Sequence, residues 1–144
     1  MALFSVTSKS TAPTRLEVTA RQFTFVIDEP PSLGGEDQGP NPVEYVLGAL
    51  LGCFNVMVNV VAGERGVTIN SLTMDAEGDL DPSKVLGKPS DNRAGYSDIR
   101  VKIHLDTEAD DATVQSILDE AKSRCPVSDN LSNPTPISFE FDRA

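Results

Sequence analysis

Alternating apolar positions predict strands near the start of the chain. Between residues 15 and 27 the apolar side chains fall into two sets, Leu16, Val18 and Ala20, followed by Phe23, Phe25 and Ile27. The parity of the alternation changes near Ala20–Gln22. Because successive strand residues face opposite sides of a sheet, such a change indicates a turn or a bulge. We therefore expect either a tight hairpin or one bent strand over Arg15–Ile27.

Three later segments also have the pattern of strands. They are Val67–Ala76, Tyr96–Leu105 and a closing strand, Ile137–Phe141. In the second segment apolar residues alternate with charged ones, so we expect one side to be buried and the other, which carries His104, to face solvent. The segments Asp28–Pro40 and Gly78–Gly95 are rich in proline, glycine and polar residues and are expected to be loops.

Signals for the start of a helix stand at Asn41. Asparagine is a favoured N-cap residue, and Pro42 suits the first helical position. Glu44 follows Asn41 by three residues, as in a capping box. The apolar run that comes next predicts a helix of roughly 22 residues, ending at about Gly63–Gly66.

This helix has almost no polar face. Asn55 and Asn59 alone interrupt its apolar run, so we expect a core helix that is buried all round. Its length approaches that of a membrane span, but Glu44, the two asparagines and the absence of flanking positive charge at its start favour a core helix. Gly48 and Gly52 lie four residues apart, which allows another element to pack closely against that face.

A second, amphipathic helix is predicted to begin near Asp110 or Asp111. Its apolar residues recur at helical spacing, at Val114, Ile117, Leu118 and Ala121. Acidic residues stand early, and Lys122 and Arg124 stand late, as the helix dipole prefers. The order β-β-α-β-β-α-β predicts an α+β fold with a mainly antiparallel sheet. Its 144 residues are expected to form a single domain, residues 1–144.

The charge balance excludes some classes of partner. The chain has 12 Lys+Arg against 22 Asp+Glu, a formal net charge of −10, without a basic cluster. Nucleic acids and anionic membrane surfaces are therefore poor partners. Residues 1–15 lack the features of a signal peptide, so we expect a cytoplasmic protein. Thiols are kept reduced there, so Cys53 and Cys125 need either a packing or a chemical explanation.

The two cysteines stand in different contexts. Cys53 lies in the middle of the apolar helix, a position that by itself favours a small core residue with a raised thiol pKa. Cys125 directly precedes Pro126, which can begin a short helix, so its sulfur would lie at a helix N-terminus beside Arg124. Both influences lower a thiol pKa. At Cys125 a reactive thiol and an ordinary loop thiol are both open.

Glu44 is explained by the capping box without any further role. On one straight helix Glu44 and Cys53 lie on opposite sides and about 13 Å apart along the axis. If both serve one site, the helix must bend, or two copies of the chain must each supply groups. The single histidine, His104, is expected at the surface, so neither Cys–His catalysis nor a zinc site is favoured, and we expect no metal or cofactor.

A family resemblance is carried by the order of several short motifs. The segments DEPP, LGG, GPNPVE and ALLGC follow one another and end at Cys53, and CPVS begins later at Cys125, ahead of the closing strand. Over roughly residues 15–141 this arrangement resembles the OsmC/Ohr family, the osmotically inducible protein C and organic hydroperoxide resistance proteins. Within this family, the DEPP and GPNPVE motifs are most similar to those of the OsmC-like branch.

The resemblance implies a fold and an activity. The fold is an intertwined homodimer in which antiparallel sheets surround a long buried central helix and a second helix, with the sites at the subunit interface. The activity is that of a thiol peroxidase that reduces alkyl or lipid hydroperoxides in oxidative and osmotic stress defence. Cys53 would be peroxidatic and become a sulfenic acid, and Cys125 would resolve it as a disulfide. A dithiol, such as a lipoylated protein, would reduce that disulfide.

The resemblance also implies a partner for the reactive thiolate. Glu44 falls at the family's glutamate, which holds a thiolate-stabilising arginine. Residues 28–40 contain no arginine, so the candidates are Arg21, which we favour, and Arg15. The alternative hypothesis is a non-catalytic, stress-associated protein on the same scaffold, which binds a small apolar ligand at the interface and in which Cys53 is merely packed.

Overall fold

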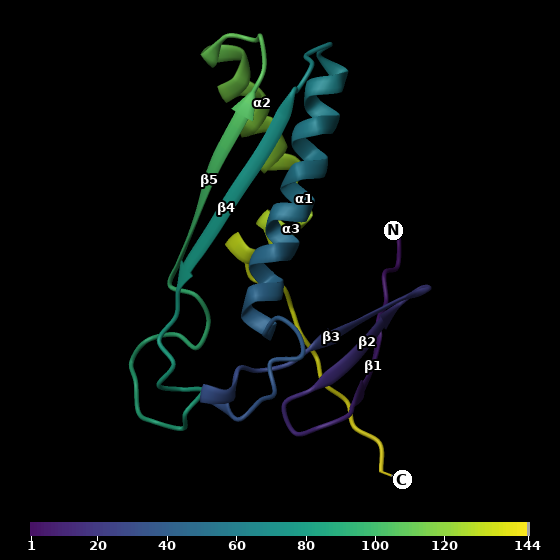
Figure 1. Cartoon of the computed structure of the whole chain (residues 1–144), viewed down its shortest axis with the longest axis vertical. Coiled ribbons are helices and arrows are strands. Elements are labelled where there is room, and N and C mark those ends of the chain that lie inside the picture. The colour runs from purple at the N-terminus through teal and green to yellow at the C-terminus, as the bar shows by residue number, and fades with distance from the viewer. Residues whose placement is uncertain (144) are drawn as a thin grey trace. The chain divides into compact units, whose positions relative to one another are not determined.

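The computed structural model describes residues 1–143 and divides into two compact units. The first unit comprises Met1–Gly48, and the second runs from Ala49 onward. The helix α1 (Pro42–Glu64) begins in the first unit and continues into the second. Helices and antiparallel strands together give the predicted α+β class (Figure 1).

The first unit contains a three-stranded antiparallel sheet. Its order is β1-β2-β3, formed by Thr7–Ser10, Leu16–Ala20 and Phe23–Ile27. Ala20 pairs with Phe23, so β2 and β3 form the tight hairpin rather than one bent strand. Arg21 takes a positive φ of 56° in the connecting turn. The strand β1 was not predicted, because its four residues are exposed and lack an apolar alternation.

Asp28 organises the loop that follows β3. Its side chain is fully buried, and its carboxylate accepts hydrogen bonds from the Thr14 hydroxyl and from the backbone N–H groups of Glu29, Glu36 and Gln38. Burial by itself raises the pKa of Asp28, but the four hydrogen bonds together outweigh burial and leave the pKa below its usual value. The short 3-10 helix Pro31–Leu33 lies within this loop.

The predicted capping box is confirmed at the start of α1. The backbone N–H of Asn41 donates to Glu44 Oε2 at 2.8 Å, and the N–H of Glu44 donates to Asn41 Oδ1 at 2.9 Å. The helix ends at Glu64, within two residues of the expected end. Its length and apolar composition would also suit a membrane span, but from Phe54 onward one side packs into a protein core.

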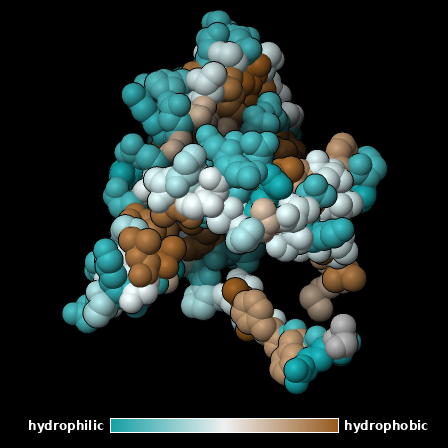
Figure 2. Space-filling model, turned by 60° about the horizontal axis from the view of Figure 1, so that its bottom comes forward, coloured by the Kyte–Doolittle hydropathy of each residue, from teal (hydrophilic) through white to brown (hydrophobic). Residues whose placement is uncertain are grey.

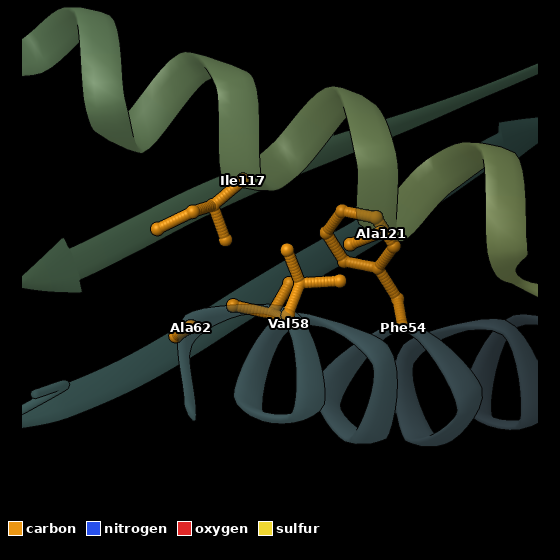
Figure 3. Close-up of a cluster of buried hydrophobic side chains, with 6 residues drawn as sticks. Phe54, Val58, Ala62, Ile117 and Ala121 are labelled. Atoms are coloured by element: carbon orange, nitrogen blue, oxygen red, sulfur yellow. The ribbon is translucent and has the colours of Figure 1, made fainter. Parts of the chain in front are cut away.

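The second unit packs helices against an antiparallel hairpin. The strands β4 (Ser71–Asp79) and β5 (Asp98–Asp106) pair along their whole length, and His104 faces outward as predicted. The helices α2 (Asp111–Arg124) and α3 (Pro126–Ser132) follow, the second beginning at Pro126 as expected. In Figure 3, side chains of α1 and α2 point toward one another and form the core. The buried cluster consists of Phe54, Val58, Val61, Ala62, Ile117 and Ala121.

The expectation that α1 is buried all round is wrong for the single chain. One stripe of the helix is exposed, and it carries Gly48, Ala49, Gly52, Val56, Val60 and Gly63. The side chains of Val56 and Val60 are 52% and 38% exposed, and no side chain or backbone lies within 4 Å of a Cβ built on Gly48 or Gly52. The described chain therefore supplies a cover for only part of the apolar surface of α1.

The closing strand is also a wrong prediction for the single chain. Residues 137–141 have no regular secondary structure, because no strand of the described chain pairs with them. Their apolar side chains are in the open, with Ile137 76%, Phe139 94% and Phe141 89% exposed. On the face that Figure 2 presents, apolar residues, in brown and tan, lie exposed among polar ones.

Replacing Asp28 by asparagine is expected to lower the melting temperature by several degrees at pH 7, because an amide would turn an N–H group toward backbone donors. Since the folded-state pKa of Asp28 lies below the unfolded value, its stabilising contribution is present above pH ~4 and is lost as the pH falls through the folded-state pKa. The difference in melting temperature between wild type and Asp28→Asn should thus shrink in acid.

Thermal melts from pH 7 to pH 2.5 measure this difference. The matched control is Asp37→Asn, at an exposed aspartate of the same loop. A difference that stays constant below pH 4, or an equal loss in the control, would contradict the role given to Asp28.

Candidate functional site

Cys125 lies at the junction of two helices. It is the C-cap residue of α2 and the N-cap residue of α3, and it is fully buried. The N–H of Ser128 donates to Cys125 Sγ at 3.4 Å, so the sulfur occupies the position in which a capping oxygen usually stands. Pro126 is the first residue of α3 and has no backbone N–H that would need an acceptor. A single residue, Cys125, can therefore link α2 to α3.

Cys53 brings a second thiol to the same place. It is half-buried on α1, and both cysteines are free. Burial raises the pKa of the Cys125 thiol above its usual value, and the neighbouring Cys53 thiol raises it further, whereas the N–H of Ser128 lowers it. Two cysteines that are far apart in the sequence therefore adjoin within the second unit.

The expected influence of Arg124 on Cys125 is wrong. The Arg124 guanidinium donates to both carboxylate oxygens of Glu64, at 2.6 and 3.1 Å, and to Glu120 at 3.0 Å. Its charge is thus balanced by two acids. Proximity in sequence did not direct the arginine toward the sulfur, and burial decides the direction of the Cys125 pKa shift.

The first unit holds the other predicted site residues. One oxygen of the Glu44 carboxylate, Oε2, accepts the hydrogen bond from the Asn41 N–H at the start of α1. The Arg15 guanidinium pairs with Glu36 at 2.7 Å, whereas Arg21 lies over the Phe23 ring, 5.2 Å from its centroid. Within residues 1–143 neither arginine forms an ion pair with Glu44. Stabilisation of the Cys53 thiolate by either arginine stays a prediction, since both cysteines belong to the second unit.

His104 is at the surface, as predicted, with its Nε2 3.7 Å from Asp75. In the part of the chain that the structure describes, no three metal-ligating side chains gather at one place. The reactive groups that the second unit brings together are the thiols of Cys53 and Cys125.

A cavity of about 490 Å³ adjoins the cysteines in the second unit. Its apolar wall comes from three elements and is formed by Leu50, Phe54, Ile99, Val101, Ile103 and Leu131. Arg93 and Lys122 also line it. Ser128 connects the cavity to the cysteine pair, because it lines the cavity and its N–H donates to Cys125 Sγ.

Sequence reasoning missed this cavity. Arg93 lies in a segment that was recognised only as a loop, and nothing in its local pattern points to a pocket. The loop is ordered by Asp81, whose carboxylate accepts from the Ser83 N–H at 2.9 Å, the Ser90 hydroxyl at 2.7 Å and the Asn92 amide at 2.8 Å. These hydrogen bonds hold the pKa of Asp81 well below its usual range. The one available signal in the sequence was the alternation of apolar residues in β5, because Ile99, Val101 and Ile103 line the cavity.

Comparison with known proteins links this site to one family. The family profile described as "OsmC-like protein" matches residues 35–140. A protein named Peroxiredoxin OsmC, from Escherichia coli (strain K12), is 25% identical over 108 residues, which cover 73% of this chain and 69% of that protein. The matched region therefore includes both cysteine motifs.

Solved structures have the same fold. An OsmC-like protein from Mycoplasma pneumoniae superposes with a TM-score of 0.78 at 20% identity, covering 91% of this chain and 88% of that one. An organic hydroperoxide resistance protein from Legionella pneumophila gives a TM-score of 0.64 at 19% identity, covering 91% of each chain. The similarity to these structures extends over nearly the whole chain and supports the predicted architecture.

The two thiols are expected to differ in their reactivity toward iodoacetamide. Thiolate is the reacting form, and Cys125 is fully buried with a raised pKa, whereas Cys53 is half-buried. In the native, reduced protein at pH 8, alkylation of Cys53 should be at least tenfold faster, as measured by peptide mass spectrometry. In guanidinium chloride the two rates should converge. Equal native rates, or faster reaction at Cys125, would contradict the geometry.

Proposed function

This chain belongs to the OsmC-like protein family, and we propose from that premise that it is a cysteine-based peroxidase that reduces organic hydroperoxides. A peroxidase-type role holds at the level of the family, whose named relatives include a peroxiredoxin and organic hydroperoxide resistance proteins. For this chain, the observation that carries the proposal is the adjacency of Cys53 and Cys125 beside an apolar cavity.

In the proposed first step the Cys53 thiolate attacks the terminal oxygen of a hydroperoxide. A sulfur–oxygen bond forms, the oxygen–oxygen bond breaks, and the leaving alkoxide takes a proton to become an alcohol. Cys53 is then a sulfenic acid, oxidised by two electrons, and the hydroperoxide has been reduced by two. The half-buried position of Cys53 supports its assignment as the peroxidatic thiol, because Cys125 is closed to a substrate.

In the second step Cys125 attacks the sulfur of the sulfenic acid. A disulfide forms, and hydroxide leaves with a proton as water. A dithiol, such as a lipoylated protein, then reduces the disulfide by two electrons and becomes a disulfide itself. The raised pKa of Cys125 is compatible with this order of events, because a thiol that stays protonated until Cys53 is oxidised does not compete for the peroxide.

We assign the stabilisation of the Cys53 thiolate to Arg21, with Glu44 as the residue that orients the arginine. Arg15 is already paired with Glu36. Arg21, by contrast, contacts the Phe23 ring and has no carboxylate partner within residues 1–143. A guanidinium without a carboxylate partner is the better candidate for a thiolate, because its charge is not already balanced. We place this activity in the cytoplasm, in defence against oxidative and osmotic stress.

One equivalent of tert-butyl hydroperoxide is expected to remove both free thiols of each reduced chain, since the sulfenic acid condenses with the second cysteine. Thiol titration and intact mass measure the loss. Cys53→Ser should abolish peroxide consumption, whereas Cys125→Ser should retain a single turnover and accumulate a sulfenic acid that a dimedone probe labels. Unchanged thiols in the wild type would refute the peroxidase and favour a ligand-binding protein with packed cysteines.

We also propose that the protein is a homodimer. The exposed stripe of α1 and the unpaired apolar segment at residues 137–141 support this, because water-exposed apolar surface of this extent is typical of an interface. Gly48 and Gly52 would let a second helix approach closely. Glu44 and Cys53 are far apart along one helix, but in a dimer each copy could supply one of them to the same site.

A charge placed in the stripe is expected to dissociate the dimer. Light scattering after size-exclusion chromatography should give twice the chain mass of 15.4 kDa for wild type and a large monomer fraction for Val56→Asp, because an unpaired carboxylate would be buried in the interface. Val85→Asp is the control, since Val85 is exposed in a loop outside the stripe. A monomeric wild type, or equal dissociation in the control, would contradict the proposal.

A further inference from the structure

Arg124 and Cys125 are adjacent in the sequence, but their side chains contact α1 at different places. The Cys125 sulfur adjoins the Cys53 thiol. The Arg124 guanidinium instead reaches the end of α1, where it donates to Glu64 Oε2 at 2.6 Å and to Glu64 Oε1 at 3.1 Å. At 1.5 Å per residue, Cys53 and Glu64 are about 16 Å apart along the helix. Two consecutive residues at the end of α2 are thus tied to two distant levels of α1.

The direction of the two helices explains how Arg124 reaches Glu64. In Figure 3 the labelled residues of α1 and of α2 follow one another in opposite directions, so the two helices are antiparallel. Long side chains in a helix point back toward the N-terminus of that helix. The side chains of Arg124 and Glu64 therefore extend toward each other and bridge the distance along the helix pair.

The contact between Arg124 and Glu64 belongs to a larger network of charges. Arg124 also donates to Glu120 Oε1 at 3.0 Å. The other oxygen of Glu120 pairs with Arg65, the residue that follows α1, and Arg65 donates to the Ser116 hydroxyl at 2.8 Å. Hydrogen bonds from the arginines lower the pKa of Glu64 and of Glu120, so both acids stay ionised. The network joins the end of α1 to three residues of α2.

This network and the apolar core constrain the helix pair in different ways. Burial of apolar side chains is non-directional, so the core resists separation of α1 and α2 more than a small shift of one helix along the other. A guanidinium that donates to both oxygens of one carboxylate is directional, because its planar fork matches the carboxylate in one geometry. The Arg124–Glu64 pair therefore fixes the position of α2 along α1.

We infer that Arg124 is a positioning residue for the cysteine pair, because its contact with Glu64 holds the α2–α3 junction at the level of α1 where Cys125 adjoins Cys53. The inference rests on the proposed function, in which the two sulfurs form a disulfide. A disulfide needs Cα atoms about 4.4–6.8 Å apart, so a shift of this junction by a few ångströms would hinder the bond. Arg124 acts through the backbone that it shares with Cys125, since acids balance its charge.

The experiment measures the stability of the disulfide in glutathione buffers, without a peroxide. Oxidised glutathione takes two electrons and two protons from Cys53 and Cys125 and leaves as two molecules of reduced glutathione. The equilibrium constant thus reports how closely the folded protein holds its two thiols together. Acid quenching, alkylation and intact mass give the ratio of disulfide to dithiol. Arg124→Gln should lower the constant at least fivefold, because α2 loses its fixed position on α1.

Two further variants test the contact itself. Glu64→Gln should lower the constant by a similar factor, and the double variant Arg124→Gln, Glu64→Gln should lower it no further, since each change removes the same contact. Arg124→Lys keeps the positive charge without the planar fork and should restore part of the loss.

Arg100→Gln is the matched control, because Arg100 also pairs with several acids but lies on the β4–β5 hairpin. This variant should keep the wild-type constant, and circular dichroism confirms that each variant is folded. A change that loosens the oxidised and the reduced forms equally leaves the constant unaltered. The inference is overturned if Arg124→Gln lowers the constant less than fivefold, if the control lowers it as much, or if wild type forms no internal disulfide.

The outcome separates this inference from the peroxidase proposal. Exchange with glutathione involves no oxygen–oxygen bond. A chain whose disulfide depends on Arg124 but whose thiols ignore tert-butyl hydroperoxide would retain the positioning role and remove the peroxidase. Peroxide-dependent thiol loss with equal constants in wild type and Arg124→Gln would retain the peroxidase and remove the role of Arg124.

Discussion

Phe54 and Val58 of α1 pack against Ile117 and Ala121 of α2, and the position of both sulfurs depends on this contact. Cys53 directly precedes Phe54, and Cys125 lies one helical turn beyond Ala121. Burial of these apolar side chains away from water stabilises the contact, by about 1.5–3 kcal/mol for each large residue. The same helices and β5 bound the cavity, so the apolar core also shapes the space beside the thiols.

Carboxylates organise the loops around this core. Asp28 accepts from three backbone N–H groups and a hydroxyl. In the loop that carries Arg93, Asp81 accepts from one backbone N–H, a hydroxyl and a side-chain amide. The backbone N–H groups of a proline- and glycine-rich loop have no strand or helix partners to accept their hydrogen bonds. A carboxylate can accept several such hydrogen bonds at once. Some of the acidic residues that give the chain its net charge of −10 thus stabilise loops of the fold.

Features that depend on neighbouring residues were predictable from the sequence. The capping box at Asn41 and Glu44 and the helix that begins at Pro126 each follow from a few adjacent side chains. The break between β2 and β3 was also visible, although the sequence left a hairpin and a bent strand both open. Features that depend on distant residues were not. Arg124 turned toward Glu64, sixty residues away, and the stripe of α1 and residues 137–141 lack a cover within the described chain.

The separation of the two cysteines along the chain has a consequence for chain entropy. A bond between Cys53 and Cys125 would close a loop of about 70 residues, which on the loop-closure account lowers the entropy of the unfolded chain by an amount worth about 4 kcal/mol. Such a bond would fasten α1 to the junction of α2 and α3. The oxidised chain would then be the harder one to unfold, and the reduced chain would keep the looser ensemble.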